Sequence, residues 1–147
     1  MVAIRANNIG QILQAKGDLE GALSYAQRAL KIDEKVYGPE HPMVAIYANN
    51  IGQILQAKGD LDGALSYTQR ALKIDEKVYG PGNPSVAIDA NNIGQILKDK
   101  RDLNGALRYI ERALKIFEAS YGPDNPLTKT AAENLERIKQ MKQAKQQ

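Results

Sequence analysis

One 42-residue unit occurs three times in succession in this 147-residue chain, and this repetition constrains the fold more than any other feature. Residues 43–84 differ from residues 1–42 at five positions, and residues 85–126 differ from residues 43–84 at thirteen. Near-identical tandem repeats of this length are typical of arrays in which one structural unit stacks on the next. We therefore expect a single array over residues 1–147, in which repeats 1–42, 43–84 and 85–126 are followed by a capping helix over residues 127–147.

Each repeat carries the signals of two helices joined by a short turn. In the second repeat, Gly59 stands where a helix would end in a left-handed conformation, and Asp60 stands where the next helix would be capped. A Tyr-Gly-Pro sequence ends that second helix, and Asn83-Pro84 begins the helix after it. The sequence thus predicts an all-α fold of seven helices. Arg101 replaces the turn glycine in the third repeat, so we expect a positive φ or a reshaped turn there, and a looser hairpin.

The first helix of each repeat is expected to pack through one side. At about 100° per residue, the side that faces the partner helix carries Val44, Ala48, Ile51, Gly52 and Leu55. Gly52 has no side chain, and small residues such as Ala64 stand on the second helix. We interpret Gly52, with Gly10 and Gly94, as a close contact between helices and not as a ligand contact.

The opposite side of each first helix carries carboxamides. Asn50 and Gln53 share this stripe with Ile46, and stacked hairpins would align such stripes along one concave surface. A carboxamide offers two donors and an acceptor, which suits the backbone of an extended peptide. The predicted peptide-binding residues of this stripe are Asn7, Asn8, Gln11, Asn49, Asn50, Gln53, Asn91, Asn92, Gln95 and Lys98.

The same amides also allow two simpler interpretations. They could solvate an exposed face, or they could bond between neighbouring helices and fix the stacking, and duplication alone would repeat them three times. One position beside the stripe differs in every copy, namely Arg5, Tyr47 and Asp89. We expect these residues to determine whatever selectivity the groove has, and we add Tyr47 and Asp89 to the predicted peptide-binding residues.

The composition argues against several kinds of function. The net charge of +3 comes entirely from residues 127–147, so the body of the array is neutral and lacks the basic surface that nucleic-acid binding requires. The absence of cysteine excludes disulfides and thiolate chemistry. Neither a signal peptide nor an apolar run of about 18 residues is present, so we expect a cytoplasmic protein with no membrane partner.

No arrangement of residues points to catalysis. The single histidine, His41, stands where Asn83 stands in the second repeat, which indicates a helix cap and not a metal ligand or general base. Asp18, Asp60 and Asp102 recur, but as caps, and no nucleophile and base converge. We expect neither enzymatic activity nor a cofactor nor a metal.

These motifs resemble the tetratricopeptide repeat family. The family's spacing matches Ala48, Ile51-Gly52, Leu55 and Ala64, and the 42-residue unit with V-A-x-x-x-N-N-[LI]-[AG], R-A-L-x-I and G-P-x-[HN]-P resembles the kinesin light chain-like subclass. The resemblance implies a right-handed superhelical solenoid of three helix-turn-helix repeats, with a concave surface that holds peptides or helices. It also implies that Asn8, Asn50 and Asn92 match the asparagine that commonly contacts the ligand backbone.

The sequence therefore favours a non-enzymatic protein-protein interaction scaffold that binds a peptide or helix in the concave, amide-lined groove. The alternative is a structural module that self-associates end to end, because the chain begins at a first helix whose leading surface is uncapped. RNA binding by a helical repeat is a third class, and the neutral body argues against it.

Overall fold

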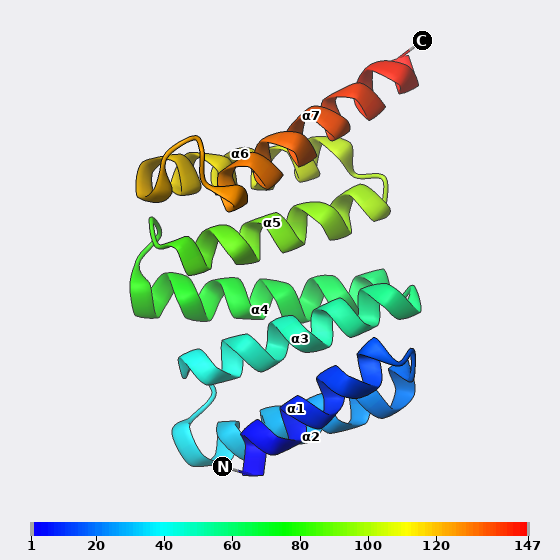
Figure 1. The fold of residues 1–147 in the computed structure, drawn as a ribbon, viewed down its shortest axis with the longest axis vertical. Helices are drawn as coiled ribbons and strands as arrows, with labels where there is room; N and C mark the ends of the chain where they lie inside the picture. The colour runs from blue at the N-terminus through cyan, green and yellow to red at the C-terminus, as the bar shows by residue number, and fades with distance from the viewer. Residues whose placement is uncertain (1, 147) are drawn as a thin grey trace. The chain divides into compact units, whose positions relative to one another are not determined.

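A computed structural model describes residues 2–146 of the chain. This part of the chain forms seven α-helices and no strand (Figure 1), which confirms the all-α prediction. The helices are α1 (Val2–Ala15), α2 (Leu19–Tyr37), α3 (Pro42–Lys58), α4 (Leu61–Tyr79), α5 (Pro84–Asp99), α6 (Leu103–Tyr121) and α7 (Pro126–Gln146).

The helices belong to two compact units. The first unit extends to Val78 and contains α1, α2, α3 and all of α4 except its last residue, whereas the second begins at Tyr79 and contains α5, α6 and α7. In each unit, first and second helices of the repeats alternate along the chain. That residues 1–147 form one continuous array remains a prediction.

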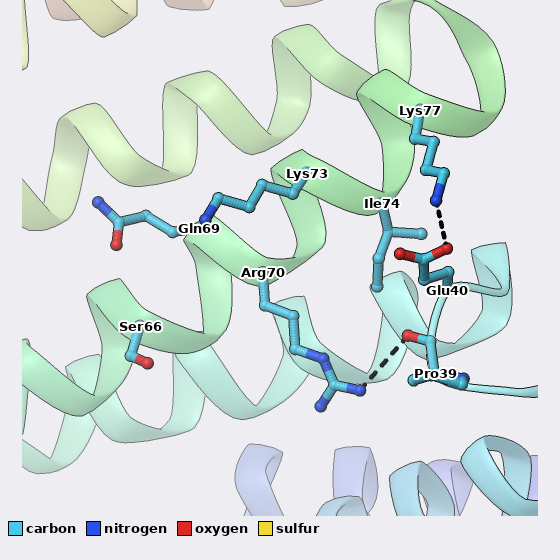
Figure 2. Close-up of a pocket in the computed structure, with 8 residues that line it drawn as sticks. All are labelled: Pro39, Glu40, Ser66, Gln69, Arg70, Lys73, Ile74 and Lys77. Atoms are coloured by element: carbon cyan, nitrogen blue, oxygen red, sulfur yellow. Dashed lines mark hydrogen bonds and ion pairs between the residues drawn. The ribbon is translucent and has the colours of Figure 1, made fainter.

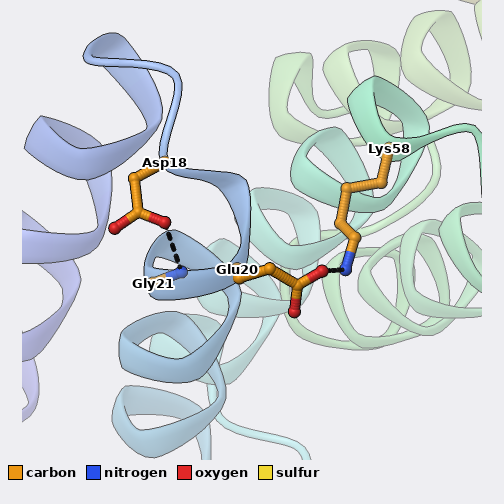
Figure 3. A network of polar contacts seen from close by, with 4 residues as sticks. All are labelled: Asp18, Glu20, Gly21 and Lys58. Atoms are coloured by element: carbon orange, nitrogen blue, oxygen red, sulfur yellow. Dashed lines mark hydrogen bonds and ion pairs between the residues drawn. The ribbon is translucent and has the colours of Figure 1, made fainter.

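The turns inside the repeats form as the sequence predicts. Gly59 ends α3 with a φ of 86° in the left-handed region, and the Gly63 amide donates to the Asp60 carboxylate at 3.0 Å. The same cap joins Gly21 to Asp18 in the first repeat (Figure 3). Each cap satisfies an amide that the first turn of a helix leaves without a partner.

The linkers between repeats also end in caps. The Met43 amide donates to Nδ1 of His41 at 3.1 Å, and the Ser85 amide donates to the side chain of Asn83 at 2.8 Å. His41 and Asn83 thus do the same work in equivalent places, each followed by a proline in the first turn of a helix. The prediction that His41 acts as a cap is confirmed.

The turn of the third repeat is as tight as the others. Arg101 adopts a φ of 69°, the only positive φ of a non-glycine residue in the part of the chain that is described. The Asp102 amide donates to the Leu97 carbonyl at 2.9 Å, the same distance as between Asp60 and Leu55 in the second repeat. The expectation of a looser hairpin is wrong, because Arg101 accepts the left-handed conformation and the turn keeps its shape.

Gly52 lies where two helices meet closely. A Cβ at this position would stand 3.2 Å from the carbonyl oxygen of Ala64 on α4 and closer still to the Thr68 hydroxyl. The equivalent Cβ at Gly94 would stand 3.3 Å from the Ala106 carbonyl oxygen on α6. The packing interpretation of these glycines is confirmed, and the first helices are thereby positioned with their polar sides away from the second helices.

Candidate functional site

Amide side chains link neighbouring first helices inside each unit. In the first unit, Nδ2 of Asn50 on α3 donates to Oδ1 of Asn7 on α1 at 2.8 Å. In the second unit, Nδ2 of Asn134 on α7 donates to Oδ1 of Asn91 on α5 at 3.3 Å. Both bonds join the first asparagine of one repeat to the second asparagine of the next. Of the interpretations that the sequence left open, the structure therefore supports a bond that fixes the stacking.

Asn134 is a member of this set that the sequence analysis missed. It is buried, and it lies 42 residues after Asn92, so the repeat period would have identified it. The capping helix α7 differs from the other first helices at most positions, which hid the equivalence.

The pairing of Asn7 with Asn50 does not exhaust the hydrogen-bonding capacity of the two side chains. One bond uses one of the two hydrogens on Asn50 Nδ2 and one lone pair on Asn7 Oδ1, so the Asn7 amide group and the Asn50 carbonyl keep their own capacity. Both residues are half-buried. The bond holds the two amides in a fixed orientation. The two side chains therefore lose less conformational entropy when a ligand binds.

The remaining amides of the first unit differ in exposure. Asn8, Gln11 and Gln53 are exposed, whereas Asn49 is half-buried and takes part in other polar contacts. Two large apolar side chains lie at equivalent positions of the repeat, Ile4 on α1 and Ile46 on α3. Each is 49% exposed. We call this surface of α1 and α3 the first-helix face. It consists of the exposed and half-buried residues of the predicted stripe: Ile4, Asn8, Gln11, Ile46, Asn50 and Gln53.

The second unit carries a shorter version of this surface. Asn91, Asn92, Gln95 and Lys98 are all half-buried on α5, and Ile88 is exposed on the same helix. None of these amides is as open as Gln53 of the first unit. The first unit is therefore the better candidate for a ligand surface.

The structure corrects the prediction for Tyr47 and Asp89. Both side chains are only 1% exposed, so neither reaches a ligand on the first-helix face. Burial, together with the nearby Asp33 carboxylate of α2, raises the pKa of the Tyr47 hydroxyl to about 12. Asp89 is likewise buried and makes polar contacts of its own. The prediction was wrong for these two residues because their side chains are packed between helices, where a ligand on the first-helix face does not reach them. Arg5, the third member of the set, is exposed.

A pocket lies against α4 in the first unit (Figure 2). This pocket of about 520 Å³ is lined by side chains of α4 and by the linker residues Pro39 and Glu40. Lys77 bonds to Glu40 at 2.6 Å, and Arg70 bonds to the Pro39 carbonyl at 3.4 Å. Since these cations already hold the linker, we interpret the pocket as a junction between repeats and not as a ligand site.

Two further observations concern the described residues only. They contain no group of three or more histidine, aspartate or glutamate side chains arranged to hold a metal ion. None of their helices is long and apolar enough to cross a membrane.

Comparisons with known proteins identify the repeats. The family model described as tetratricopeptide repeat matches residues 2–77, 45–119 and 86–147. None of the curated protein sequences matches the chain.

Several solved structures share the fold. The crystal structure of BtubC (BKLC) from P. vanneervenii matches with a TM-score of 0.85 and 24% identity, over 92% of this chain and 54% of that one. A kinesin light chain protein of Podosopora anserina with nearly identical TPR-like repeats matches with a TM-score of 0.83 and 16% identity, over 91% and 64%. The Sgt2 TPR domain from Aspergillus fumigatus matches with a TM-score of 0.72 and 20% identity, over 99% and 82%.

This chain thus spans between about half and two thirds of the first two proteins, and at these identities the likeness concerns the fold. It confirms the helical-repeat solenoid and the resemblance to kinesin light chain-like repeats. Since the family model matches in three overlapping segments from residue 2 to residue 147, the chain belongs to the tetratricopeptide repeat family.

Proposed function

We propose that this chain is a non-enzymatic protein-interaction scaffold and that the first-helix face of its first unit binds a peptide or a helix. Tetratricopeptide repeats are protein-interaction modules, and family membership supports this general role. The finer proposal, a ligand on this particular face, is supported by the composition of the face. The cytoplasmic location expected from the sequence remains part of the proposal.

One observation carries the proposal. Ile46 is 49% exposed on α3, and the amide of Gln53 is exposed two turns further along the same helix. Large apolar side chains this exposed gain free energy when a ligand covers them, at about 25 cal/mol for each Å² removed from water. Amides beside them can satisfy the ligand's backbone groups, which would otherwise lose their hydrogen bonds to water. An apolar patch with amides around it suits a peptide, because the patch can contact the peptide's side chains while the amides bond to its backbone.

The test uses the exposed amides and leaves the Asn7–Asn50 bond intact. We would select ligands for the wild-type chain from a displayed peptide library and then measure their binding to a triple variant, Asn8→Ala, Gln11→Ala and Gln53→Ala. We expect affinity to fall roughly tenfold or more, since several polar contacts would be lost, while the helical content measured by circular dichroism stays constant.

A matched control removes polar groups on the other side of the first unit. Gln69→Ala with Ser66→Ala changes exposed residues of α4 and should leave affinity unchanged. Equal binding of the wild type and the triple variant would contradict the proposal.

The alternative function is end-to-end self-association through α1. It is favoured by the exposure of Val2, Ile9 and Ile12, which form an apolar stripe on that helix. Sedimentation velocity over a wide concentration range tests it, because an associating chain sediments faster as concentration rises. A constant monomer would dismiss this alternative.

A further inference from the structure

The turn of the third repeat and the end of α7 form a basic pocket in the second unit. The pocket has a volume of about 250 Å³ and is lined by three cations, Arg101 from the turn and Lys142 and Lys145 from α7. Its one carboxylate, Asp102, caps α6. The three cations and this carboxylate leave a net charge of +2, and none of the three cations forms an ion pair with a residue that the structure describes.

The equivalent site of the first repeat is balanced in charge. There Lys58 forms an ion pair with Glu20 (Figure 3). The equivalent residues of the third repeat are Lys142 and Asn104, so a neutral amide stands in place of the carboxylate. Lys142 is half-buried, and a charge that is partly removed from water is costly unless an opposite charge lies beside it. The basic pocket therefore favours an anion.

The other two cations are additions to the repeat pattern. Arg101 replaces Gly17, and Lys145 lies three positions beyond the equivalent of Lys58, the last residue of α3. The turn itself does not require Arg101, because its φ of 69° lies in the region that glycine adopts without strain. The third repeat thus carries positive charge where the fold would be satisfied by a smaller, neutral residue.

A largely apolar hollow of about 410 Å³ adjoins the basic pocket. It shares Arg101, Leu103 and Lys145 with the pocket and is completed by Met141 and Ala144. Among the described residues that line the two hollows there is no aromatic side chain, on which the bases of a single-stranded nucleic acid would stack. The arrangement suits a ligand with a doubly charged anionic group beside an apolar part.

We propose that the basic pocket binds a phosphate monoester, with the apolar part of the ester in the adjoining hollow. A phosphate monoester carries a charge close to −2 at neutral pH on one compact group, which matches the net charge of the pocket. The guanidinium of Arg101 can donate two parallel hydrogen bonds to such a group, and the lysines add point charges. The site lies in the second unit, so it does not depend on the function proposed for the first-helix face.

Phenyl phosphate is the probe, because it joins a phosphate group to one apolar ring. We would titrate it into the full-length chain labelled with nitrogen-15 and follow the backbone amide signals at neutral pH and constant ionic strength. The signals of residues 101–104 and 141–145 should shift saturably. The affinity should be roughly tenfold higher than that for benzenesulfonate, which has the same ring and a single charge. Inorganic phosphate, which lacks the ring, should shift the same signals but bind more weakly.

Variants with a matched control locate the site. Arg101→Gly and Lys142→Gln should each weaken the binding of phenyl phosphate roughly tenfold, since each removes a charge-assisted hydrogen bond. Lys139→Gln removes the same charge from an exposed residue of α7 that lines neither hollow, and it should leave the affinity unchanged. Asn104→Glu should weaken binding by supplying the missing carboxylate from within the chain. Because glycine suits the turn, the effect of Arg101→Gly cannot come from a loss of folding.

A phosphotyrosine peptide library identifies the source of the ester. Library peptides that bind more tightly than phenyl phosphate would assign the ester to a phosphorylated side chain of a partner protein. If none binds more tightly, the ligand is a small phosphate ester.

Four results would overturn the proposal. The first is the absence of a saturable shift at residues 101–104 and 141–145, and the second is equal affinity for phenyl phosphate and benzenesulfonate. The third is an equal effect of Lys142→Gln and Lys139→Gln. The fourth is binding of phthalate, which carries two carboxylates on the same ring, as tightly as phenyl phosphate, which would assign the pocket to acidic ligands without phosphate.

Discussion

Arg101 holds a left-handed conformation that glycine holds in the equivalent turns. Its φ of 69° compares with 86° for both Gly17 and Gly59. For a residue with a side chain, the left-handed region costs roughly 1–2 kcal/mol, because Cβ approaches the following carbonyl. Gly59 has no atom within 4 Å of the place where a Cβ would stand, so the cost at this turn comes from the backbone and not from crowding.

We therefore expect Arg101→Gly to stabilise the chain. The net gain should be about 0.5–1 kcal/mol, since glycine relieves the strain but makes the unfolded chain more flexible. Urea unfolding measures it. The reciprocal variant Gly59→Arg serves as the control and should destabilise the chain by a similar amount, whereas unchanged midpoints in both variants would show that the turn holds no strain.

At the scale of the element, the fit between the two helices of a hairpin depends on one residue pair. Gly52 lies over Thr68, whose hydroxyl donates to the Ala64 carbonyl at 2.8 Å inside the packed interface. In the first repeat the residue equivalent to Thr68 is Ala26, and a Cβ at Gly10 would meet no side-chain oxygen among its nearest atoms. Two hairpins of nearly identical sequence therefore differ in how much space they leave at the crossing.

This difference predicts an unequal response to alanine. Gly52→Ala should destabilise the chain by about 1–3 kcal/mol, because the new methyl group collides with the Thr68 hydroxyl in a closely packed contact. Gly10→Ala should cost less, and the gain in helix propensity of about 1 kcal/mol offsets part of it.

A double-mutant cycle identifies the cause. Combining Gly52→Ala with Thr68→Ala should cost less than the sum of the single losses, with a coupling of roughly 0.5–3 kcal/mol. If the losses of stability are additive in thermal or urea unfolding, the cost of Gly52→Ala comes from contact with the Ala64 carbonyl and not from contact with Thr68.

At the scale of the whole molecule, most of the fold follows from local signals in the sequence. The turn glycines, the aspartate caps and the prolines after His41 and Asn83 each act within a few residues, so the repeat pattern predicts every helix. The hydrogen bond between Asn7 and Asn50 is harder to predict from the sequence. The two residues are 43 positions apart, and the bond depends on the rotation and spacing of their helices. The sequence shows only that amides recur, and it leaves their partners open.

The burial of Tyr47 was also beyond the sequence. Its position lies between the packing side and the polar side of α3, and a change from Arg5 to Tyr47 to Asp89 suggests an exposed, variable site. Only the packing of α2 against α3, with Asp33 beside Tyr47, shows that this side chain is buried.

The two asparagine pairs lie in different compact units, so loss of one pair should be felt mainly in its own unit. Asn7→Ala removes the bond between α1 and α3, and Asn91→Ala removes the bond between α5 and α7. Each should cost about 0.5–1.5 kcal/mol, the usual net value of such a hydrogen bond. In repeat arrays, stability is a sum of local and nearest-neighbour contributions, and openings can be confined to part of the chain. Hydrogen exchange followed by mass spectrometry should therefore show faster exchange in α1–α3 for Asn7→Ala and in α5–α7 for Asn91→Ala. If either variant accelerates exchange equally throughout residues 2–146, the chain opens as one cooperative body and its division into two units has no energetic counterpart.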